Sequence, residues 1–274
     1  MKSAAFAASA ALLAAASVAA AIDVRVGFEN GDQGWSIQNA VTILPDGGNP
    51  GAHLAHFQID TFGVNIANST SREFIGNYAD KGPVRVGLDI LVNRIWMEFA
   101  GDVPRDLIVE LRDYQNVPEG YPWVSVWYNL GTLTSNTPWE TRSVEIADPT
   151  SVTMPAGWGG TGAEDPVTFE PRLPANRTFA DVLASVDEIV FTTFVPGFFF
   201  GFTNFDIGVD NVFIQSLSGC PADFNADGQV DFFDYLDFSN AYAADEPSAD
   251  FNSDGQVDFF DYLDFAGAFG SPCE

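Results

Sequence analysis

Two acidic segments near the C-terminus hold side chains of the types and spacing that suit a metal ion. Residues 222–238 return 27 residues later as 249–265, with the single change of Ala226 to Ser253. A duplication of this length points to one structural unit that is used twice. Within each copy, oxygen-bearing side chains stand at positions 1, 3, 5, 9 and 12 of a loop, and glycine stands at position 6.

This spacing indicates two calcium sites. A hard cation takes about six to eight oxygen ligands, which alternate residues of a tightly curled loop can supply, and a glycine allows the sharp turn. In the first loop the candidate ligands are Asp223, Asn225, Asp227, the backbone carbonyl of Gln229, Asp231 and Asp234. In the second they are Asp250, Asn252, Asp254, the carbonyl of Gln256, Asp258 and Asp261. Magnesium is a weaker candidate because it prefers a stricter octahedron, and an acidic turn with accidental spacing is the other interpretation.

The elements that position these loops are helices that follow them. Cys220-Pro221-Ala222 cannot form a helix before the first loop, and Pro247 interrupts the chain before the second. After the loops, aromatic residues recur at helical spacing, at Phe232, Tyr235, Phe238 and Tyr242 and again at Phe259, Tyr262, Phe265 and Phe269. Because the carboxylates of one loop repel each other without a cation, we expect calcium binding and folding of this segment to be coupled.

This pair of half-EF-hands resembles the type I dockerin domain over residues 219–274, and its bracketing cysteines resemble those of the cysteine-framed, GC-type variant. The resemblance implies a small α-helical domain that binds two calcium ions and docks on a cohesin-like partner or a cell-surface scaffold protein. In that family the positions just after loop position 9 help to recognise the partner. Here they hold Phe232, Phe233, Phe259 and Phe260, where hydroxyl and basic side chains are commoner. The other interpretation places these phenylalanines in the core.

The start of the chain and its charge indicate an exported protein. Met1-Lys2-Ser3 and the alanine-rich stretch that follows have the pattern of a signal peptide over residues 1–21. In an exported protein the only two cysteines, Cys220 and Cys273, most simply form a disulfide, and two free thiols are the alternative. The net charge of −27 argues against nucleic acid, and no later stretch is apolar enough to span a membrane. We expect a secreted protein that is extracellular or associated with the cell surface.

Composition changes near Gly219, and residues 22–217 predict a separate, mainly β domain, a two-sheet sandwich of the jelly-roll type. Short alternating runs in this part are bounded by Gly, Pro, Asn and Asp. We predict strands at 84–92, 95–99, 107–111, 124–128, 141–146, 188–194 and 209–214, and one helix at 179–186.

The two ends of this domain resemble the first and last strands of carbohydrate-binding-like and laminin-G-like jelly rolls. The segments that carry the resemblance are 27–31, with Gly34-Trp35 after it, and 208–212. It implies that the terminal strands are neighbours and that Glu29 and Asp210 hold a structural calcium ion. A capped strand end would give the same pattern.

Tryptophans of the sandwich are candidate sugar-binding residues. Trp123, Ser125 and Trp127 alternate onto one face of a predicted strand. Stacked aromatic rings on a sheet face can hold a pyranose through apolar contact. Tryptophan at alternate strand positions also occurs in sandwich cores, which is the other interpretation.

The sequence contains no constellation that predicts catalysis. His53 and His56 are three residues apart in an extended segment, so their side chains tend to diverge. Acidic pairs such as Glu98 and Glu110 are unavoidable among 38 acids. We therefore predict a non-enzymatic sandwich displayed by a calcium-binding, dockerin-like module. A carbohydrate-binding module is the alternative, and a polysaccharide-degrading enzyme is a less favoured one.

Overall fold

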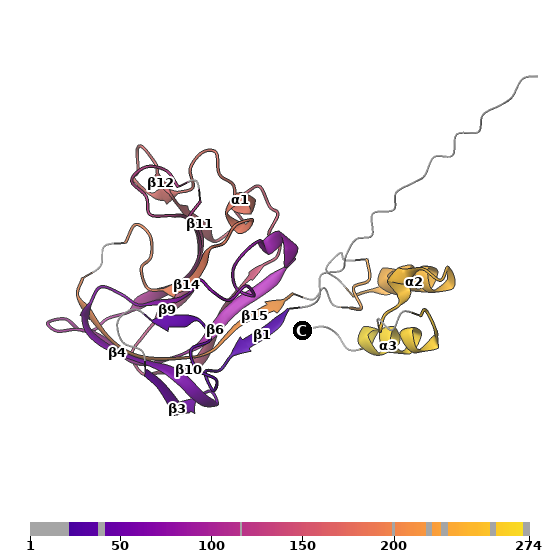
Figure 1. Cartoon of the computed structure of the whole chain (residues 1–274), viewed down its shortest axis with the longest axis horizontal. Helices are drawn as coiled ribbons and strands as arrows, with labels where there is room; N and C mark the ends of the chain where they lie inside the picture. Colours follow the sequence, from indigo (N-terminus) through magenta and orange to yellow (C-terminus); the bar gives the residue numbers. More distant parts are fainter. Residues whose placement is uncertain are drawn as a thin grey trace, which may run out of the picture.

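The structure is a computed structural model that describes residues 22–37, 42–115, 117–198, 201–217, 221–225, 230–252 and 256–270. The predicted signal peptide and the predicted disulfide between Cys220 and Cys273 lie outside these residues. In the described residues, two separate groups of buried apolar side chains occur, one drawn from residues 22–214 and one from residues 224–269. Strands form most of the first group and helices form most of the second (Figure 1).

Residues 23–216 form two antiparallel sheets. The first has the strand order β10-β6-β15-β4-β3, with β1 also paired to β15 and β7 to β6. Its strands are β1 Asp23–Val26, β3 Thr42–Gly48, β4 Gly51–Thr61, β6 Val84–Met97, β7 Gly101–Asp102, β10 Thr137–Ile146 and β15 Thr203–Ser216. The second has the order β11-β9-β8-β14-β5-β2 and comprises β2 Trp35–Ile37, β5 Asn65–Asn68, β8 Arg105–Asp113, β9 Val124–Leu133, β11 Trp158–Thr161 and β14 Glu188–Thr192. Strands β12 Ala163–Glu164 and β13 Pro171–Arg172 pair with each other.

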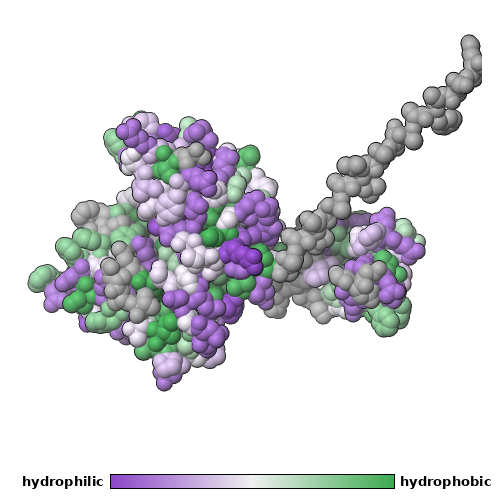
Figure 2. Space-filling view, viewed as in Figure 1, coloured by the Kyte–Doolittle hydropathy of each residue, from purple (hydrophilic) through white to green (hydrophobic). Residues whose placement is uncertain are grey.

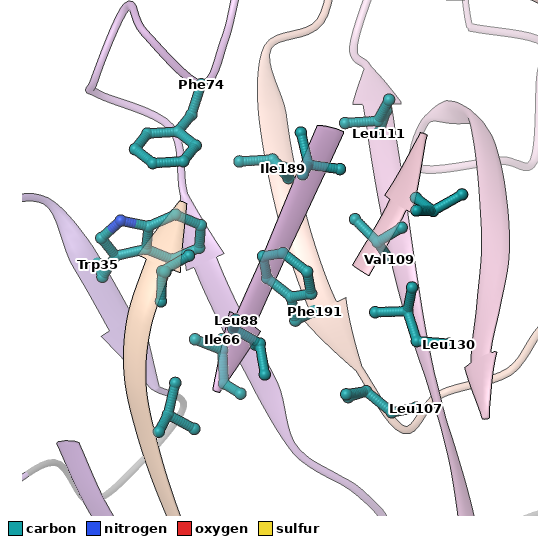
Figure 3. Packing of buried hydrophobic residues seen from close by; sticks show 14 of the residues in the cluster. Trp35, Ile66, Phe74, Leu88, Leu107, Val109, Leu111, Leu130, Ile189 and Phe191 are labelled. Carbon is teal, nitrogen blue, oxygen red and sulfur yellow. The ribbon is translucent and has the colours of Figure 1, made fainter. Parts of the chain in front are cut away.

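Apolar side chains from both sheets fill the space between them (Figure 3). Strand β8 shows how the alternation of a strand divides its residues between the two faces. Leu107, Val109 and Leu111 point into the core, and Glu110 and Arg112 point to the outer face of the second sheet. The chain is therefore a two-layer β-sandwich with few helices.

The first and last strands of the sandwich are neighbours. β1 pairs with β15 in antiparallel fashion, with Val26 opposite Val212. This pairing brings Glu29, which follows β1, to the part of the fold that holds Asp210.

Strand β6 joins two strands that the sequence predicts as separate. The division into strands 84–92 and 95–99 is wrong, because β6 runs unbroken from Val84 to Met97. Polar Asn93 and Arg94 interrupt the apolar alternation, but the strand continues through them as a bulge. Val92 stands opposite Ile207 and Arg94 opposite Asp206, so Asn93 is the extra residue.

Helices are few in the described residues. Helix α1 Phe179–Leu183 is shorter than predicted and begins with a capping box of Thr178 and Asp181. Single 3₁₀ turns occur at η1 Tyr78–Asp80 and η2 Pro247–Ala249. No described helix is long and apolar enough to cross a membrane.

The C-terminal residues form two helices around a small aromatic core. α2 spans Phe232–Ala243 and α3 spans Phe259–Phe269, so a helix follows each acidic loop as the aromatic spacing predicts. The rings of Phe238 and Phe265 are fully buried and stack with their centroids 3.9 Å apart. Equivalent residues of the two sequence copies thus pack on each other at the centre of this small core.

Truncation of a core ring should destabilise the sandwich. Phe191 is fully buried and lies 5.9 Å from the Trp35 ring, so Phe191→Ala should lower the free energy of unfolding by about 3–5 kcal/mol. Phe99 is fully exposed, so Phe99→Ala should change the free energy of unfolding by no more than about 0.5 kcal/mol. Urea denaturation of both variants measures the difference, and equal stabilities would contradict the core assignment.

Candidate functional site

A groove of about 460 Å³ lies on the outer face of the second sheet. Strands β8 and β9 form its floor, with Arg112 opposite Ser125 and Glu110 opposite Trp127. Its lining residues are Asn65, Glu110, Arg112, Tyr121, Pro122, Trp123, Thr161, Phe194, Val195, Pro196, Gly197 and Phe198. The lining therefore combines aromatic rings with a small number of polar groups.

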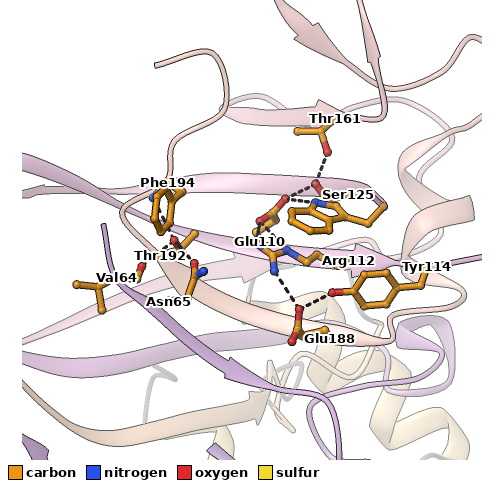
Figure 4. Close-up of polar contacts among 11 residues, drawn as sticks. Val64, Asn65, Glu110, Arg112, Tyr114, Ser125, Thr161, Glu188, Thr192 and Phe194 are labelled. Atoms are coloured by element: carbon orange, nitrogen blue, oxygen red, sulfur yellow. Dashed lines mark hydrogen bonds and ion pairs between the residues drawn. The ribbon is translucent and has the colours of Figure 1, made fainter. Parts of the chain in front are cut away.

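A buried carboxylate organises the polar part of this groove (Figure 4). Glu110 is 3% exposed, and its Oε2 accepts hydrogen bonds from Nε and Nη2 of Arg112 at 2.8 and 2.6 Å. Its Oε1 accepts from the Trp123 indole N–H at 2.9 Å and from the Ser125 hydroxyl at 2.6 Å. Four donors therefore satisfy a charge that would otherwise be costly to bury.

Arg112 joins a second carboxylate to the same network. Its Nη1 donates to Oε2 of Glu188 at 3.0 Å, and the Tyr114 hydroxyl donates to the same oxygen at 2.7 Å. Burial lowers the pKa of Arg112, but the carboxylates of Glu110 and Glu188 outweigh that effect and raise it. Burial, and then the bond to Glu188, raises the pKa of Tyr114 to about 12. Arg112 therefore stays charged and Tyr114 stays protonated at neutral pH.

The network holds the Trp123 ring in one orientation. The guanidinium carbon of Arg112 lies over the ring, 3.9 Å from its centroid, and the Tyr114 ring meets it edge to face at 6.1 Å. The indole N–H is held by Glu110 at the same time. A ring fixed from several sides presents its remaining surface to the groove without losing rotamer freedom when a ligand binds.

Trp127 lies on the same outer face but does not line the groove. A Cβ atom at Gly159 of β11 would stand only 2.4 Å from carbons of the Trp127 indole, so the ring packs directly on that backbone. Its buried indole N–H has no hydrogen-bond partner in the described part of the chain. Of the two tryptophans singled out from sequence, only Trp123 reaches the groove.

Several groove residues were not singled out from sequence. Tyr121 precedes Trp123 by two residues, and this aromatic pair was the one feature of the sequence that could have identified Tyr121 as a groove residue. Asn65, Arg112 and Phe198 come from distant parts of the chain, and only the pairing of β5, β14 and β8 brings them together.

The carboxylate pair Glu98 and Glu110 is not brought together. Glu98 follows β6 of the first sheet, and Glu110 lies on β8 of the second. His53 and His56 are both buried on β4; the His53 ring meets Trp139 edge to face, and His56 stands opposite Ile207.

The two acidic loops close in the same way at their last candidate ligand. Asp234 is fully buried and accepts from the backbone N–H of Asn225 at 3.1 Å and of Asp231 at 2.8 Å. Asp261, 27 residues later, is also fully buried and accepts from Asn252 at 3.1 Å and Asp258 at 2.7 Å. Each carboxylate therefore joins the start of its loop to the first turn of the next helix.

The chemistry of the donor set fits a hard cation, although the described residues do not complete a site. The candidate ligands Asp227, Gln229 and Asp254 lie outside the described residues. In the remainder, which includes Asp223, Asp250 and Gln256, no group of three or more acidic, histidine or cysteine side chains is placed to hold a metal ion. Both calcium loops therefore stay predictions.

The phenylalanines that begin the two helices are exposed. Phe232 and Phe233 are each 63% exposed, and Phe259 and Phe260 are 62% and 63% exposed. Leu236 and Leu263, one turn further on, are also exposed. These apolar side chains lie outside the small core that Phe238 and Phe265 form.

Glu29 and Asp210 approach each other beside the turn between β3 and β4. Asp210 is fully buried and accepts from the backbone N–H of Asn49 at 2.5 Å and of Asn211 at 2.6 Å. Burial raises the pKa of Asp210, and the negative charges of Glu29 and Asp89 add to that shift. The structural calcium ion at this place stays a prediction.

A comparison of the sequence with protein families and with curated proteins finds no match. Similar solved structures include the family 11 carbohydrate-binding module of Clostridium thermocellum in complex with a mixed-linked β-1,3-1,4 tetrasaccharide, at 11% identity and a TM-score of 0.43 over 71% of this chain and 95% of that one. The CBM22-2 xylan-binding domain of Paenibacillus barcinonensis Xyn10C matches at 12% identity and a TM-score of 0.39 over 70% of this chain and 98% of that one. A carbohydrate esterase of the Shiga toxin-encoding bacteriophage phi24B matches at 11% identity and a TM-score of 0.39, over 72% of this chain and 100% of that one. Similarity at this level says nothing about the ligand of this chain.

The ionisation of Tyr114 offers a test of the groove geometry. Its folded-state pKa of about 12 lies above the ordinary value of 10.0. The contribution of this hydroxyl to stability is therefore fully present below about pH 10 and is lost as the pH rises toward about 12. The phenolate absorbance is measured as a function of pH for the wild type and for Tyr114→Phe. The difference between the two titrations should show a component with its midpoint at a pH well above 10.0. A component with the ordinary midpoint would mean that Tyr114 is neither partly buried nor bonded to Glu188.

Proposed function

We propose that the β-sandwich is a carbohydrate-binding domain that holds a polysaccharide chain in the groove of the second sheet without cleaving it. The observation that carries this proposal is Trp123, an aromatic ring fixed by Arg112 and Glu110 at the wall of an open groove of about 460 Å³. Binding sites of this kind pair apolar surface with a few oriented polar groups.

The composition of the groove suits a sugar. Tyr121, Trp123 and Phe198 offer ring faces and edges for the apolar C–H surface of a pyranose. Asn65 and Thr161 lie beside them with polar groups that match sugar hydroxyls. Arg112 is paired with two carboxylates, so the groove has no excess positive charge to favour an anionic ligand.

The arrangement favours binding over catalysis. Glu110 accepts four hydrogen bonds from protein groups, and Oε2 of Glu188 accepts two. Carboxylates that are engaged in this way are poorly placed to exchange a proton with a substrate. Their work is to hold Arg112, Trp123 and Tyr114.

Trp123→Ala should weaken binding to the polysaccharide that a glycan array identifies by at least about tenfold, because the variant removes the central aromatic contact. Phe57→Ala is the matched control, since Phe57 is an exposed ring on the first sheet. Affinity electrophoresis in gels that contain the polysaccharide compares the two. Equal retention of both variants, or no bound glycan on the array, would refute the groove as the site.

We also propose that the C-terminal segment is a calcium-dependent docking module of the dockerin kind in an exported protein. The supporting observation is the identical closure of two duplicated loops by the buried carboxylates of Asp234 and Asp261. The predicted ligands of each loop would hold one calcium ion, which supplies the charge that lets the carboxylates gather.

Exposed phenylalanines support a docking role for this module. Phe232, Phe233, Phe259 and Phe260 are solvated in pairs at the start of each helix, and exposed apolar surface commonly marks a protein interface. From residue 220 to 274 the sequence has thirteen acidic side chains and no Lys or Arg. A partner with apolar and basic surface, such as a cohesin-like or cell-surface scaffold protein, would complement it.

Asp234→Asn should reduce the number of calcium ions bound by the chain by one, because the variant removes the carboxylate that closes the first loop. Asp237→Asn is the control, since Asp237 is exposed on the same helix. Isothermal titration with Ca²⁺ measures the stoichiometry in both variants. An unchanged stoichiometry in Asp234→Asn would show that the loop assignment is wrong.

A further inference from the structure

A second cavity, of about 590 Å³, lies at the side of the sandwich where both sheets end. β10 is the last strand of the first sheet and β11 the last strand of the second, and the cavity is lined from both edges. It shares no lining residue with the groove. Its volume falls in the range of about 300–1,000 Å³ that is usual for small-molecule sites.

An aromatic wall closes the inner side of this cavity. The ring of Trp158 lies 5.5 Å from that of Tyr128 and 5.1 Å from that of buried Phe179. Tyr128 also packs on the backbone at Gly157, where a Cβ atom would stand 2.8 Å from the ring. Both lining rings are therefore held in place without a ligand.

The polar tips of these two rings are available. No described residue forms a hydrogen bond with the Tyr128 hydroxyl or with the indole N–H of Trp158. Neither of these two atoms is fully buried. Both therefore reach solvent at the cavity. Val144 and Ile146 of β10 line the opposite edge with buried apolar side chains.

The charge of the cavity disfavours an anion. Arg85 is ion-paired with Glu145, and Asp148 adds a further carboxylate to the lining. The net charge of these three side chains is negative, whereas their oxygen atoms are good acceptors for hydroxyl groups.

We propose that this cavity is a second carbohydrate site that takes a single neutral pyranose. Trp158 and Tyr128 contact the ring of the sugar, and their N–H and O–H groups bond to its hydroxyls. The proposal extends the proposed function from the groove to the edge of the same domain. It depends on a different set of side chains, so each site is tested separately.

The test follows the indole ¹⁵N–H signals of the full chain by NMR during titration with neutral monosaccharides, namely glucose, xylose, galactose and mannose, and with glucuronate. Trp158→Phe assigns the Trp158 signal. This signal should shift in a saturable way with at least one neutral sugar, in the wild type and in Trp123→Ala alike. Tyr128→Phe removes a hydroxyl without a described partner, so this variant should fold normally and weaken binding about 3- to 10-fold.

Four outcomes would overturn the proposal, and three of them are these: no neutral sugar moves the Trp158 signal, glucuronate binds more tightly than every neutral sugar, or Tyr128→Phe binds as the wild type does. Loss of the Trp158 shift in Trp123→Ala would also overturn it, because the groove alone would then bind the sugar. Polysaccharide binding that is lost in Trp123→Ala while the Trp158 shift persists supports two separate sites. A Trp158 shift in a chain that binds no polysaccharide supports the second carbohydrate site and contradicts the proposal that the groove binds a polysaccharide.

Discussion

The ion pair of Arg112 with Glu110 is the interaction around which the outer face of the second sheet is arranged. Both residues are almost fully buried on β8, at positions that alternate with core residues. Removing two charges from water is costly, and the cost is offset only when every donor and acceptor is well placed. Trp123, Ser125 and Glu188 provide those partners, so the same contacts that permit the burial also orient the aromatic ring of the groove. Aromatic and polar surface thereby meet in a fixed geometry.

A different constraint governs the C-terminal segment. Asp231 and Asp258 cap the two helices and Asp234 and Asp261 accept from the backbone of the preceding loops, so each loop and its helix are one hydrogen-bonded unit. The two units meet through the stacked rings of Phe238 and Phe265. Four acidic positions in each loop leave a strong excess of negative charge, which a cation of matching size would relieve.

Aromatic side chains play several distinct parts in this molecule, and their surroundings separate them. The rings of Trp35 and Phe191 are buried in the core (Figure 3), whereas Trp127 is covered by the backbone of β11. Trp123 lines the groove and Trp158 lines the second cavity. The indole N–H of Trp123 is bound to Glu110, whereas that of Trp158 has no described partner. Figure 2 shows a mixed surface in which apolar side chains lie among hydrophilic ones. Hydropathy alone therefore does not separate binding rings from core rings.

The sequence by itself determined the features that depend on local order. Alternation predicted strands within β6, β8, β9, β10, β14 and β15, because side chains of a strand point to opposite faces in turn. Aromatic spacing after the loops predicted α2 and α3, and the duplication identified Asp234 and Asp261 as equivalent residues. Only the tertiary structure decided that Trp123 lines a groove and Trp127 does not, since the backbone that covers Trp127 belongs to Gly159. It also united Asn65, Arg112 and Phe198, because pairing between strands distant in sequence depends on the packing of the whole core and leaves no signature in any one segment.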